Sequence, residues 1–354
     1  MELLFLNENF EIKKLVDTFQ NFSWQHKYFE PGCFSIETFL EDYAEIRENN
    51  CKYLCSKDYR ETALIETVKY KGSYNNTNVV LTGRFLEQVL EDRVIKNTFT
   101  YTGTREEIAR KLVNDFCINC ENPLFNGNLR LGTYKGLGSR IVYQNTGDDI
   151  KTALYSLLKV EDMSYSIDYD YTQNTLTFNV WKGLDRTESQ SVNSWAIFSR
   201  NFENIEKDEY SKDETQFKNV AYVAGEGIGG DRIVVEVNQV ANDEDRKELY
   251  VDARDLQQKD DMSDSEYRQT LYQRGLEKLE ENNRVEITEF EVDINANITY
   301  KEDFDLGDKV MYKNEDLGIY VENRIVEISE VFEGNEETIE VVFGDDYSIK
   351  KVVK

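Results

Sequence analysis

The C-terminal part of the chain alternates apolar and polar residues between short turns, and this pattern leaves few folds open to it. The alternating segments are residues 309–313, 319–328 and 338–343. Turn-forming stretches bound them at residues 306–308, 314–318 and 333–335. Alternation with a period of two between turn residues is typical of antiparallel strands. The sequence therefore predicts a three-stranded antiparallel meander close to the C-terminus.

Polar residues within this meander are the first candidates for a functional site. Asp308, Asp316 and Arg324 are the residues that could form one. An aspartate beside a glycine is ordinary turn chemistry, however. We therefore expect these three residues to lie in turns and on the solvent face.

The first hundred residues show the same alternation. Four residues share one face of the segment that precedes the Pro31-Gly32 turn: Phe22, Trp24, His26 and Tyr28. Further strands are expected at residues 33–40, 61–70 and 78–82, followed by a helix at 85–95. Residues 1–100 are therefore predicted to form a mostly antiparallel β domain, either a small barrel or a sandwich.

Helical patterns dominate the next part of the chain. Thr104 and Glu107 form a capping box, which places a helix at residues 105–117, and a second helix is expected at 149–160. A hairpin with strands near 165–169 and 176–180 follows. Residues 101–185 are therefore predicted to form an α+β insertion domain.

A second β domain is predicted from residues 186–242 and 284–354, with a helical insertion at 243–283 between its two parts. A capping box at Ser263 and Glu266 begins the inserted helix, which is expected to reach about residue 282. The clearest alternation in the chain, at residues 290–298, predicts a strand directly after the insertion. The expected fold class is α+β, mainly antiparallel β.

The charge balance excludes several classes of partner. Lys and Arg number 42 against 69 Asp and Glu, which gives a net charge of −27. A nucleic-acid-binding surface needs cations that displace counterions from phosphate, and docking on anionic lipid needs them too. No run of 18 apolar residues predicts a membrane span, and the N-terminus lacks the features of a secretory signal. We expect the protein to be made in a bacterial cytoplasm.

No residue pattern predicts catalysis, a cofactor or a metal. The spacing Cys117-x-x-Cys120, together with Cys51 and Cys55, is compatible with zinc, but the apolar surroundings favour buried thiols. His26 is the only histidine and is expected in a core or an interface. The GxGxxG pattern at 225–230 precedes a predicted strand instead of the helix that a dinucleotide site requires.

Short motifs spread over nearly the whole chain resemble the phage tail-hub and baseplate-hub proteins, including siphophage tail-tip proteins and the hubs of phage-derived contractile particles. The resemblance rests on the following residues: Trp24, Tyr28, Gly32, Phe34, Gly83, Gly183, Asp185, Arg186, Leu306, Gly307, Asp308 and Arg324. It implies that the two β domains are small barrel-like tube domains of a hub, with the α+β domain inserted between them.

The resemblance also implies a function and a location. The protein is expected to be a structural hub at the distal end of a phage or tailocin-type tail, where a homotrimeric ring joins the tail tube or distal tail protein to the spike or tip. Baseplate wedge and tape-measure proteins are further expected partners. Three copies would carry a charge of −81, and we hypothesise that acidic residues line the lumen so that DNA passes without binding.

Two other functions remain open from the sequence. With 69 acidic residues, pairs such as Asp168 and Asp170 arise freely, and a cell-wall glycosidase or lytic tail enzyme needs only two carboxylates in the right geometry. A carbohydrate-binding tail protein is the third interpretation. It would bind glycans without turning them over.

Overall fold

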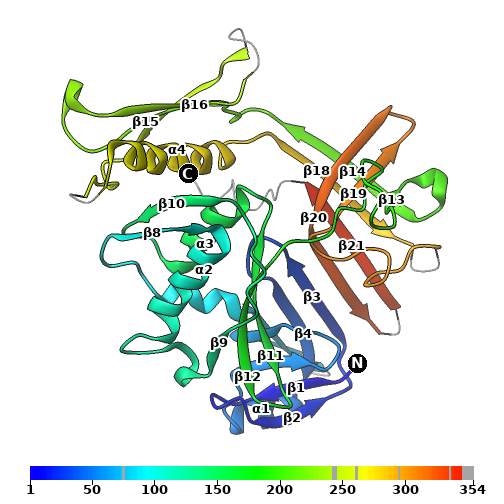
Figure 1. The fold of residues 1–354 in the computed structure, drawn as a ribbon. Helices are drawn as coiled ribbons and strands as arrows, with labels where there is room; N and C mark the ends of the chain where they lie inside the picture. Colours follow the sequence, from blue (N-terminus) through cyan, green and yellow to red (C-terminus); the bar gives the residue numbers. More distant parts are fainter. Residues whose placement is uncertain (74–75, 241–244, 260–261, 294–295, 335, 345–354) are drawn as a thin grey trace. The chain divides into compact units, whose positions relative to one another are not determined.

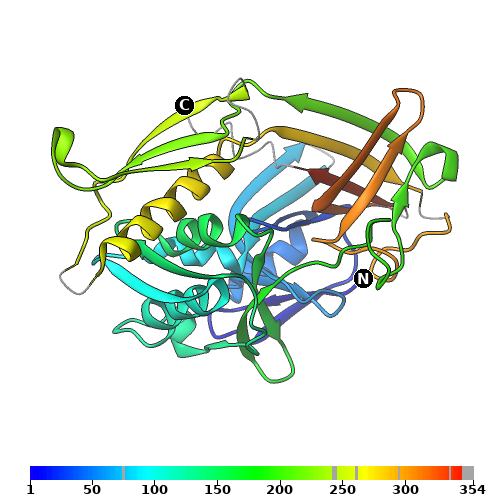
Figure 2. The same cartoon turned by 45° about the horizontal axis from the view of Figure 1, so that its top comes forward.

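The computed structural model describes residues 1–73, 76–240, 245–259, 262–293, 296–334 and 336–344 (Figures 1 and 2). The described residues divide into two compact units, which are treated separately below. Unit 1 comprises Met1–Gln88, Tyr165–Ser211 and the described part of Ile287–Lys354. Unit 2 comprises Val89–Ser164 and Lys212–Glu286.

Strands from both ends of the sequence pair in unit 1. Thirteen strands of the described residues form one sheet, with the order β14-β18-β21-β20-β3-β4-β7-β6-β5-β1-β2. The strand β19 pairs with β20, and β13 pairs with β19. Their bounds are β1 Leu3–Leu6, β2 Ile12–Val16, β3 Asn21–Lys27, β4 Cys33–Phe39, β5 Tyr53–Ser56, β6 Thr62–Ser73, β7 Asn76–Phe85, β13 Ile197–Phe198, β14 Ile205–Asp213, β18 Val285–Val292, β19 Lys309–Asn314, β20 Ile319–Glu333 and β21 Glu336–Gly344.

The predicted C-terminal meander is confirmed as β19, β20 and β21. The strand β20 is longer than expected, because its first part pairs with β19 and its second part lies between β21 and β3. The register places Glu330 opposite Trp24 and Ile328 opposite His26. The two β regions of the sequence therefore share a continuous sheet (Figure 1).

This arrangement confirms the mainly antiparallel α+β fold class. Within the described residues the sheet closes into no barrel, since its strand order ends at β14 on one side and at β2 on the other. The two barrel-like regions are therefore open. Side chains alternate between the two faces of the N-terminal strands, so every second residue of a strand points into the core. Trp24, Ile36 and Leu81 lie on this face and are fully buried.

Smaller elements complete unit 1. They are the helix α1 Leu40–Glu48, the 3-10 helices η1 Leu86–Asp92 and η4 Arg200–Phe202, and the hairpin of β11 Ser164–Asp170 and β12 Thr175–Trp181. The hairpin matches the predicted one. The strand expected at residues 290–298 is wrong beyond Val292, where β18 ends, and the Ala296 amide donates to the Asp293 carbonyl oxygen. Residues 294–295 of that segment lie outside the described residues.

Unit 2 contains the two predicted helices of the central region. They are α2 Arg105–Val113, which continues as the π-helix η2 Asn114–Ile118, and α3 Ile150–Lys159. The capping box of Thr104 and Glu107 is present. The strand β8 Phe99–Thr104 directly precedes α2 and pairs antiparallel with β10 Arg140–Asn145. Between α2 and α3 in the sequence lie η3 Leu124–Gly127, β9 Leu129–Leu131 and β10.

A three-stranded sheet and a long helix form the rest of unit 2. The strands are β15 Val220–Ala224, β16 Val234–Asn238 and β17 Glu248–Asp252, and a short 3-10 helix, η5 Gly229–Asp231, follows β15. The helix α4 Asp264–Glu280 begins at the predicted Ser263–Glu266 capping box. It packs closely on the sheet at Gly275, where a Cβ atom would lie 2.4 Å from the Val237 side chain.

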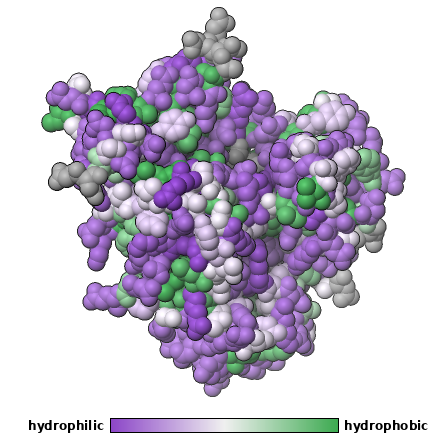
Figure 3. All heavy atoms as spheres, in the orientation of Figure 1, coloured by the Kyte–Doolittle hydropathy of each residue, from purple (hydrophilic) through white to green (hydrophobic). Residues whose placement is uncertain are grey.

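The expected helical insertion at 243–283 thus contains a strand, β17, as well as α4. The four domain limits derived from the sequence stay a prediction. Among the described residues, no helix is long and apolar enough to cross a membrane. Hydrophilic residues cover most of the face shown in Figure 3, and hydrophobic residues form small separate patches on it.

Candidate functional site

Two motif glycines bring distant segments of unit 1 into backbone contact. A Cβ atom on Gly183 would lie 1.9 Å from the Gly307 carbonyl oxygen, so no larger residue fits there. Gly307 has φ +82° and faces the Tyr28 ring, from which a Cβ atom would be separated by 2.2 Å. Both positions therefore require glycine, the second for its backbone conformation as well. We call this contact and the side chains around it the Asp308 junction.

The carboxylate of Asp308 ties this junction together. Its Oδ1 accepts the Leu184 amide at 2.7 Å, and its Oδ2 accepts Arg186 Nε at 2.7 Å. Oδ2 also accepts the Asp305 amide at 3.1 Å. Asp308 is only 3% exposed. A buried carboxylate is tolerated when an ion pair and several hydrogen bonds replace its hydration, and all of these are present.

Arg324 and Tyr28 close the other side of the junction. An Nη1 atom of Arg324 donates to the Gly307 carbonyl oxygen, and the guanidinium lies 5.4 Å from the centre of the Tyr28 ring. The Tyr28 hydroxyl accepts the Gly183 amide at 3.2 Å. The junction therefore joins residues from three separate parts of the sequence through buried polar contacts.

The expectation that Asp308 and Arg324 face solvent is wrong. Both are buried: Asp308 accepts Arg186 Nε, and Arg324 Nη1 donates to the Gly307 carbonyl oxygen. Asp316 does lie in an exposed loop, as expected. Local turn chemistry described the backbone at Gly307-Asp308 correctly, but it could not reveal a partner more than a hundred residues away.

The remaining motif residues are not part of this junction. Asp185 accepts the amide and hydroxyl of Thr187 within its own loop. Leu306, which precedes Gly307 in the sequence, is buried. Four residues lie within β3, β4 and β7 and the turn between β3 and β4: Trp24, Gly32, Phe34 and Gly83. There the two glycines again permit close approach, and the Gly83 position faces the Leu64 carbonyl oxygen.

A buried charge network around His26 was not predicted. His26 Nε2 lies 3.0 Å from an oxygen of Glu330, and Nδ1 lies 3.4 Å from an oxygen of Glu61. Tyr59 donates its hydroxyl to the second oxygen of Glu330 at 3.0 Å, and Arg60 pairs with Glu61 at 3.0 Å. His26 itself is 4% exposed, which confirms its expected place in a core. Local sequence patterns did not identify its carboxylate partners, because Glu330 lies 304 positions away.

The partners of His26 decide its charge. Burial would lower the pKa of His26, but the carboxylates of Glu61 and Glu330 outweigh burial and raise it to about 9. Burial would likewise raise the pKa of Glu61, whereas His26 and Arg60 lower it to about 2. At neutral pH the network therefore holds an imidazolium between two carboxylates.

A cavity of about 20 Å³ lies beside this network, lined in part by Glu87 and Trp181. Burial raises the pKa of Glu87 to about 8, so this carboxyl is neutral at pH 7. Pockets that hold small-molecule ligands typically measure about 300–1,000 Å³. The cavity is far smaller than such pockets.

Other candidate sites of the sequence are placed as follows. Cys55 and Cys117 are buried, and burial raises the pKa of each thiol to about 12. Among the described residues, no group of three or more histidine, cysteine or acidic side chains could hold a metal ion. The GxGxxG stretch connects the antiparallel strands β15 and β16, as its context predicted.

Asp168 and Asp170 do not form a catalytic pair. Asp170 is exposed and accepts the amide and hydroxyl of Thr172 in a turn. Asp168 accepts the Asn179 side chain at 2.8 Å. Both carboxylates therefore accept hydrogen bonds within the same β11–β12 hairpin.

Comparison with known proteins identifies the family of the chain and related folds. The sequence matches the Siphovirus ReqiPepy6 Gp37-like protein family over residues 2–345. No curated protein sequence matches the chain. The fold is similar to a tail protein from Neisseria meningitidis MC58, with a TM-score of 0.58 and 15% identity over 94% of both chains.

Two further solved structures share the fold. Prophage tail protein gp18 from Listeria monocytogenes EGD-e has a TM-score of 0.57 and 13% identity, covering 99% of this chain and 97% of its own. The 43 kDa tail protein of prophage MuSo2 from Shewanella oneidensis has a TM-score of 0.53 and 12% identity, covering 94% and 97%. The resemblance expected from the short motifs is thereby confirmed. The chain belongs to the Siphovirus ReqiPepy6 Gp37-like protein family, a family of phage tail proteins.

Proposed function

We propose that the protein is a structural hub at the distal end of a phage or phage-like tail, where three copies form a ring that joins the tail tube to the spike or tip. The observation that carries this proposal is the Asp308 junction. Its buried charges and two obligatory glycines fix distant segments of one unit against each other, and no reacting group is free within it. A site built in this way works through shape.

The continuous sheet of unit 1 supports the same role. A hub bears mechanical load between the tube and the tip, and the pairing of β3 with β20 connects N-terminal and C-terminal strands by backbone hydrogen bonds. The His26 network adds a buried ionic contact across this pairing, from β3 to Glu330 of β20. Load applied to either β region is therefore carried into the other.

We infer a non-enzymatic role for the same reasons. Among the acidic residues described above, Asp168 and Asp170 accept hydrogen bonds within their hairpin, and Glu61 pairs with Arg60. Purified protein should leave the turbidity of a bacterial cell-wall suspension unchanged. Lysis that disappears when one acid pair is substituted would overturn this inference.

The ring is tested by native mass spectrometry and negative-stain imaging of the purified protein. We expect a mass three times that of one chain and ring-shaped particles with a central channel. The acidic composition further leads us to propose that DNA passes this channel without adhering. A monomer at every concentration tested would refute the hub.

A further inference from the structure

A rigid loop of unit 1 exposes two large hydrophobic side chains. The loop comprises residues 185–196, and we call it the Trp195 loop. Val192 is 90% exposed and Trp195 is 56% exposed. Residues 189–196 carry no charge, although 31% of the residues in the chain are charged. Exposed tryptophan on a surface is typical of binding hot spots.

The loop is held by its own side chains. Gln190 Oε1 accepts the amides of Val192 and Asn193 at 2.7 and 2.8 Å, and Gln190 Nε2 donates to the Thr187 carbonyl oxygen at 3.0 Å. The Trp195 indole donates to the Gln190 carbonyl oxygen at 3.1 Å. A loop fixed in this way loses little conformational entropy on binding, which favours affinity.

The Asp308 junction anchors the base of the loop. Arg186 pairs with Asp308, and the Arg186 carbonyl oxygen accepts the Ala196 amide at 2.9 Å, so both ends of the loop are tied to the junction. The motif residues Arg186 and Asp308 therefore also anchor the Trp195 loop. They set the position from which Val192 and Trp195 project.

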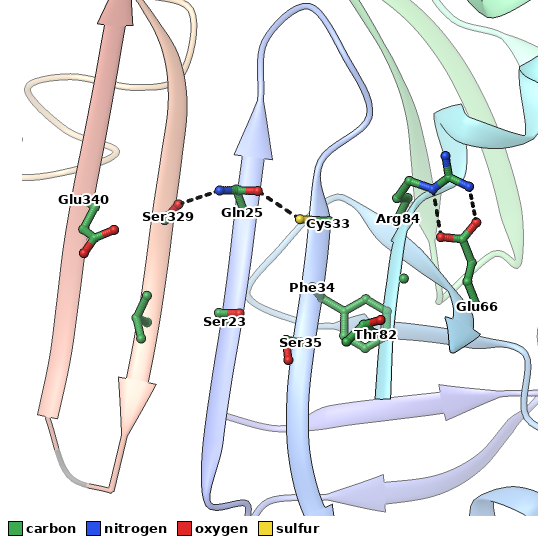
Figure 4. Close-up of a pocket in the computed structure, with 12 residues that line it drawn as sticks. Ser23, Gln25, Cys33, Phe34, Ser35, Glu66, Thr82, Arg84, Ser329 and Glu340 are labelled. Carbon is green, nitrogen blue, oxygen red and sulfur yellow. Dashed lines mark hydrogen bonds and ion pairs between the residues drawn. The ribbon is translucent and has the colours of Figure 1, made fainter. Parts of the chain in front are cut away.

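A groove of about 500 Å³ lies on the face of the main sheet opposite its core (Figure 4). Small polar side chains line its middle: Ser23 on β3, Cys33 and Ser35 on β4, Thr82 on β7 and Ser329 on β20. Figure 4 shows Glu340 on one side and the Arg84–Glu66 pair on the other. The middle of the groove is thus uncharged, and it is large enough for an indole ring.

We propose that the Trp195 loop of one copy docks into this groove of the next copy. Copies with a charge of −27 repel each other, so association is favoured at surfaces without net charge, and residues 189–196 of the loop and the middle of the groove are such surfaces. Because the two surfaces differ, the contact is head-to-tail, and such contacts close into rings when the rotation allows. This inference rests on the proposed ring and identifies its interface.

The native Cys33 thiol in the groove provides a direct test. In the variant Val192→Cys, oxidation by copper phenanthroline in air should join residue 192 of one copy to Cys33 of the next, and a closed ring should give a covalent trimer on a non-reducing denaturing gel. The matched control Val192→Cys with Cys33→Ser retains the other cysteines and should remain monomeric on the gel. If the wild-type protein is a trimer but oxidised Val192→Cys gives no oligomer that depends on Cys33, the proposed interface is refuted and the proposed ring is not.

A second variant tests the tryptophan without crosslinking. Trp195→Ser should raise the concentration at which the trimer dissociates at least tenfold, as measured by mass photometry or native mass spectrometry. The matched control is Ile228→Ser, which changes an apolar side chain that is 88% exposed in unit 2 and should leave the trimer intact. Equal effects of the two substitutions would refute the proposed contact. A wild-type monomer would refute the ring as well.

Discussion

Raising the pH from 6.5 to 9 should remove the proton from His26 and weaken unit 1. In the folded chain, both ring nitrogens of His26 face carboxylates, at 3.0 Å for Glu330 and 3.4 Å for Glu61. Only the imidazolium can donate to both at once. Deprotonation therefore leaves one of the two buried carboxylates without its hydrogen bond from His26.

The size of the effect follows from the pKa of His26. A pKa raised from 6.5 to about 9 corresponds to about 3 kcal/mol of stability, because each pKa unit is worth about 1.4 kcal/mol. The protonated form is favoured in the folded state. The contribution is therefore complete below pH 6.5 and is lost progressively as the pH rises through about 9.

The titration of Glu87 also lowers stability as the pH rises, over a pH range that overlaps that of His26. Its contribution must therefore be separated from that of His26. Burial raises its pKa from 4.5 to about 8, so the folded state retains a proton that the unfolded state has lost. Stability consequently falls as the pH rises from 4.5 to about 8. The variant Glu87→Gln removes this titration and keeps the carbonyl oxygen that accepts the Ile167 amide. Urea unfolding of this variant should still lose about 3 kcal/mol between pH 6.5 and 9.

The single histidine makes the measurement direct. Protein labelled with ¹³C-histidine should give one ring resonance, and its titration needs no assignment. We expect a midpoint near pH 9, and the variant Glu87→Gln with His26→Gln should lack the loss of stability between pH 6.5 and 9. A midpoint at or below 6.5 would show that burial outweighs the carboxylates, and the reasoning above would be refuted.

Three further predictions concern stability measured by urea unfolding. Asp308→Asn removes the buried carboxylate that pairs with Arg186 and should cost about 3–5 kcal/mol, whereas the exposed Asp316→Asn should change stability by less than about 0.5 kcal/mol. Gly307→Ala should cost about 3–5 kcal/mol because it combines positive φ with a clash, whereas Gly318→Ala, with φ +63° and no atom within 4 Å of its Cβ, should cost about 1–2 kcal/mol. Ser263→Ala removes the cap of α4 and should cost about 1 kcal/mol. Equal costs for either matched pair, or an unchanged α4 variant, would contradict the corresponding argument.

Local patterns in the sequence predicted those parts of the fold that depend on local interactions. Both capping boxes begin helices where the sequence placed them, since the serine or threonine and the glutamate that form each box are three residues apart. The C-terminal meander follows from its turns and its period of two. The extension of β20 beyond the predicted strand was missed, because its last part is stabilised by pairing with β3, some three hundred residues away in the sequence.

The candidate site could not be predicted for a related reason. Asp308 and Arg186 are 122 positions apart, and His26 and Glu330 are 304 positions apart. No periodicity links such pairs, and 69 acidic residues offer each cation many possible partners. The family resemblance named most residues of the Asp308 junction, but it did not say that they meet. The His26 network lay outside the motifs altogether.

The chemistry of the Asp308 junction explains why a buried ion pair is retained there. Apolar residues of similar size often replace a buried pair without loss of stability, so stability alone does not require one. Apolar side chains could not, however, accept the Leu184 and Asp305 amides or orient Arg186, which Asp308 does together. These contacts determine where the Trp195 loop begins and ends. The junction therefore fixes a geometry, and the proposed hub would depend on that geometry more than on any single contribution to its stability.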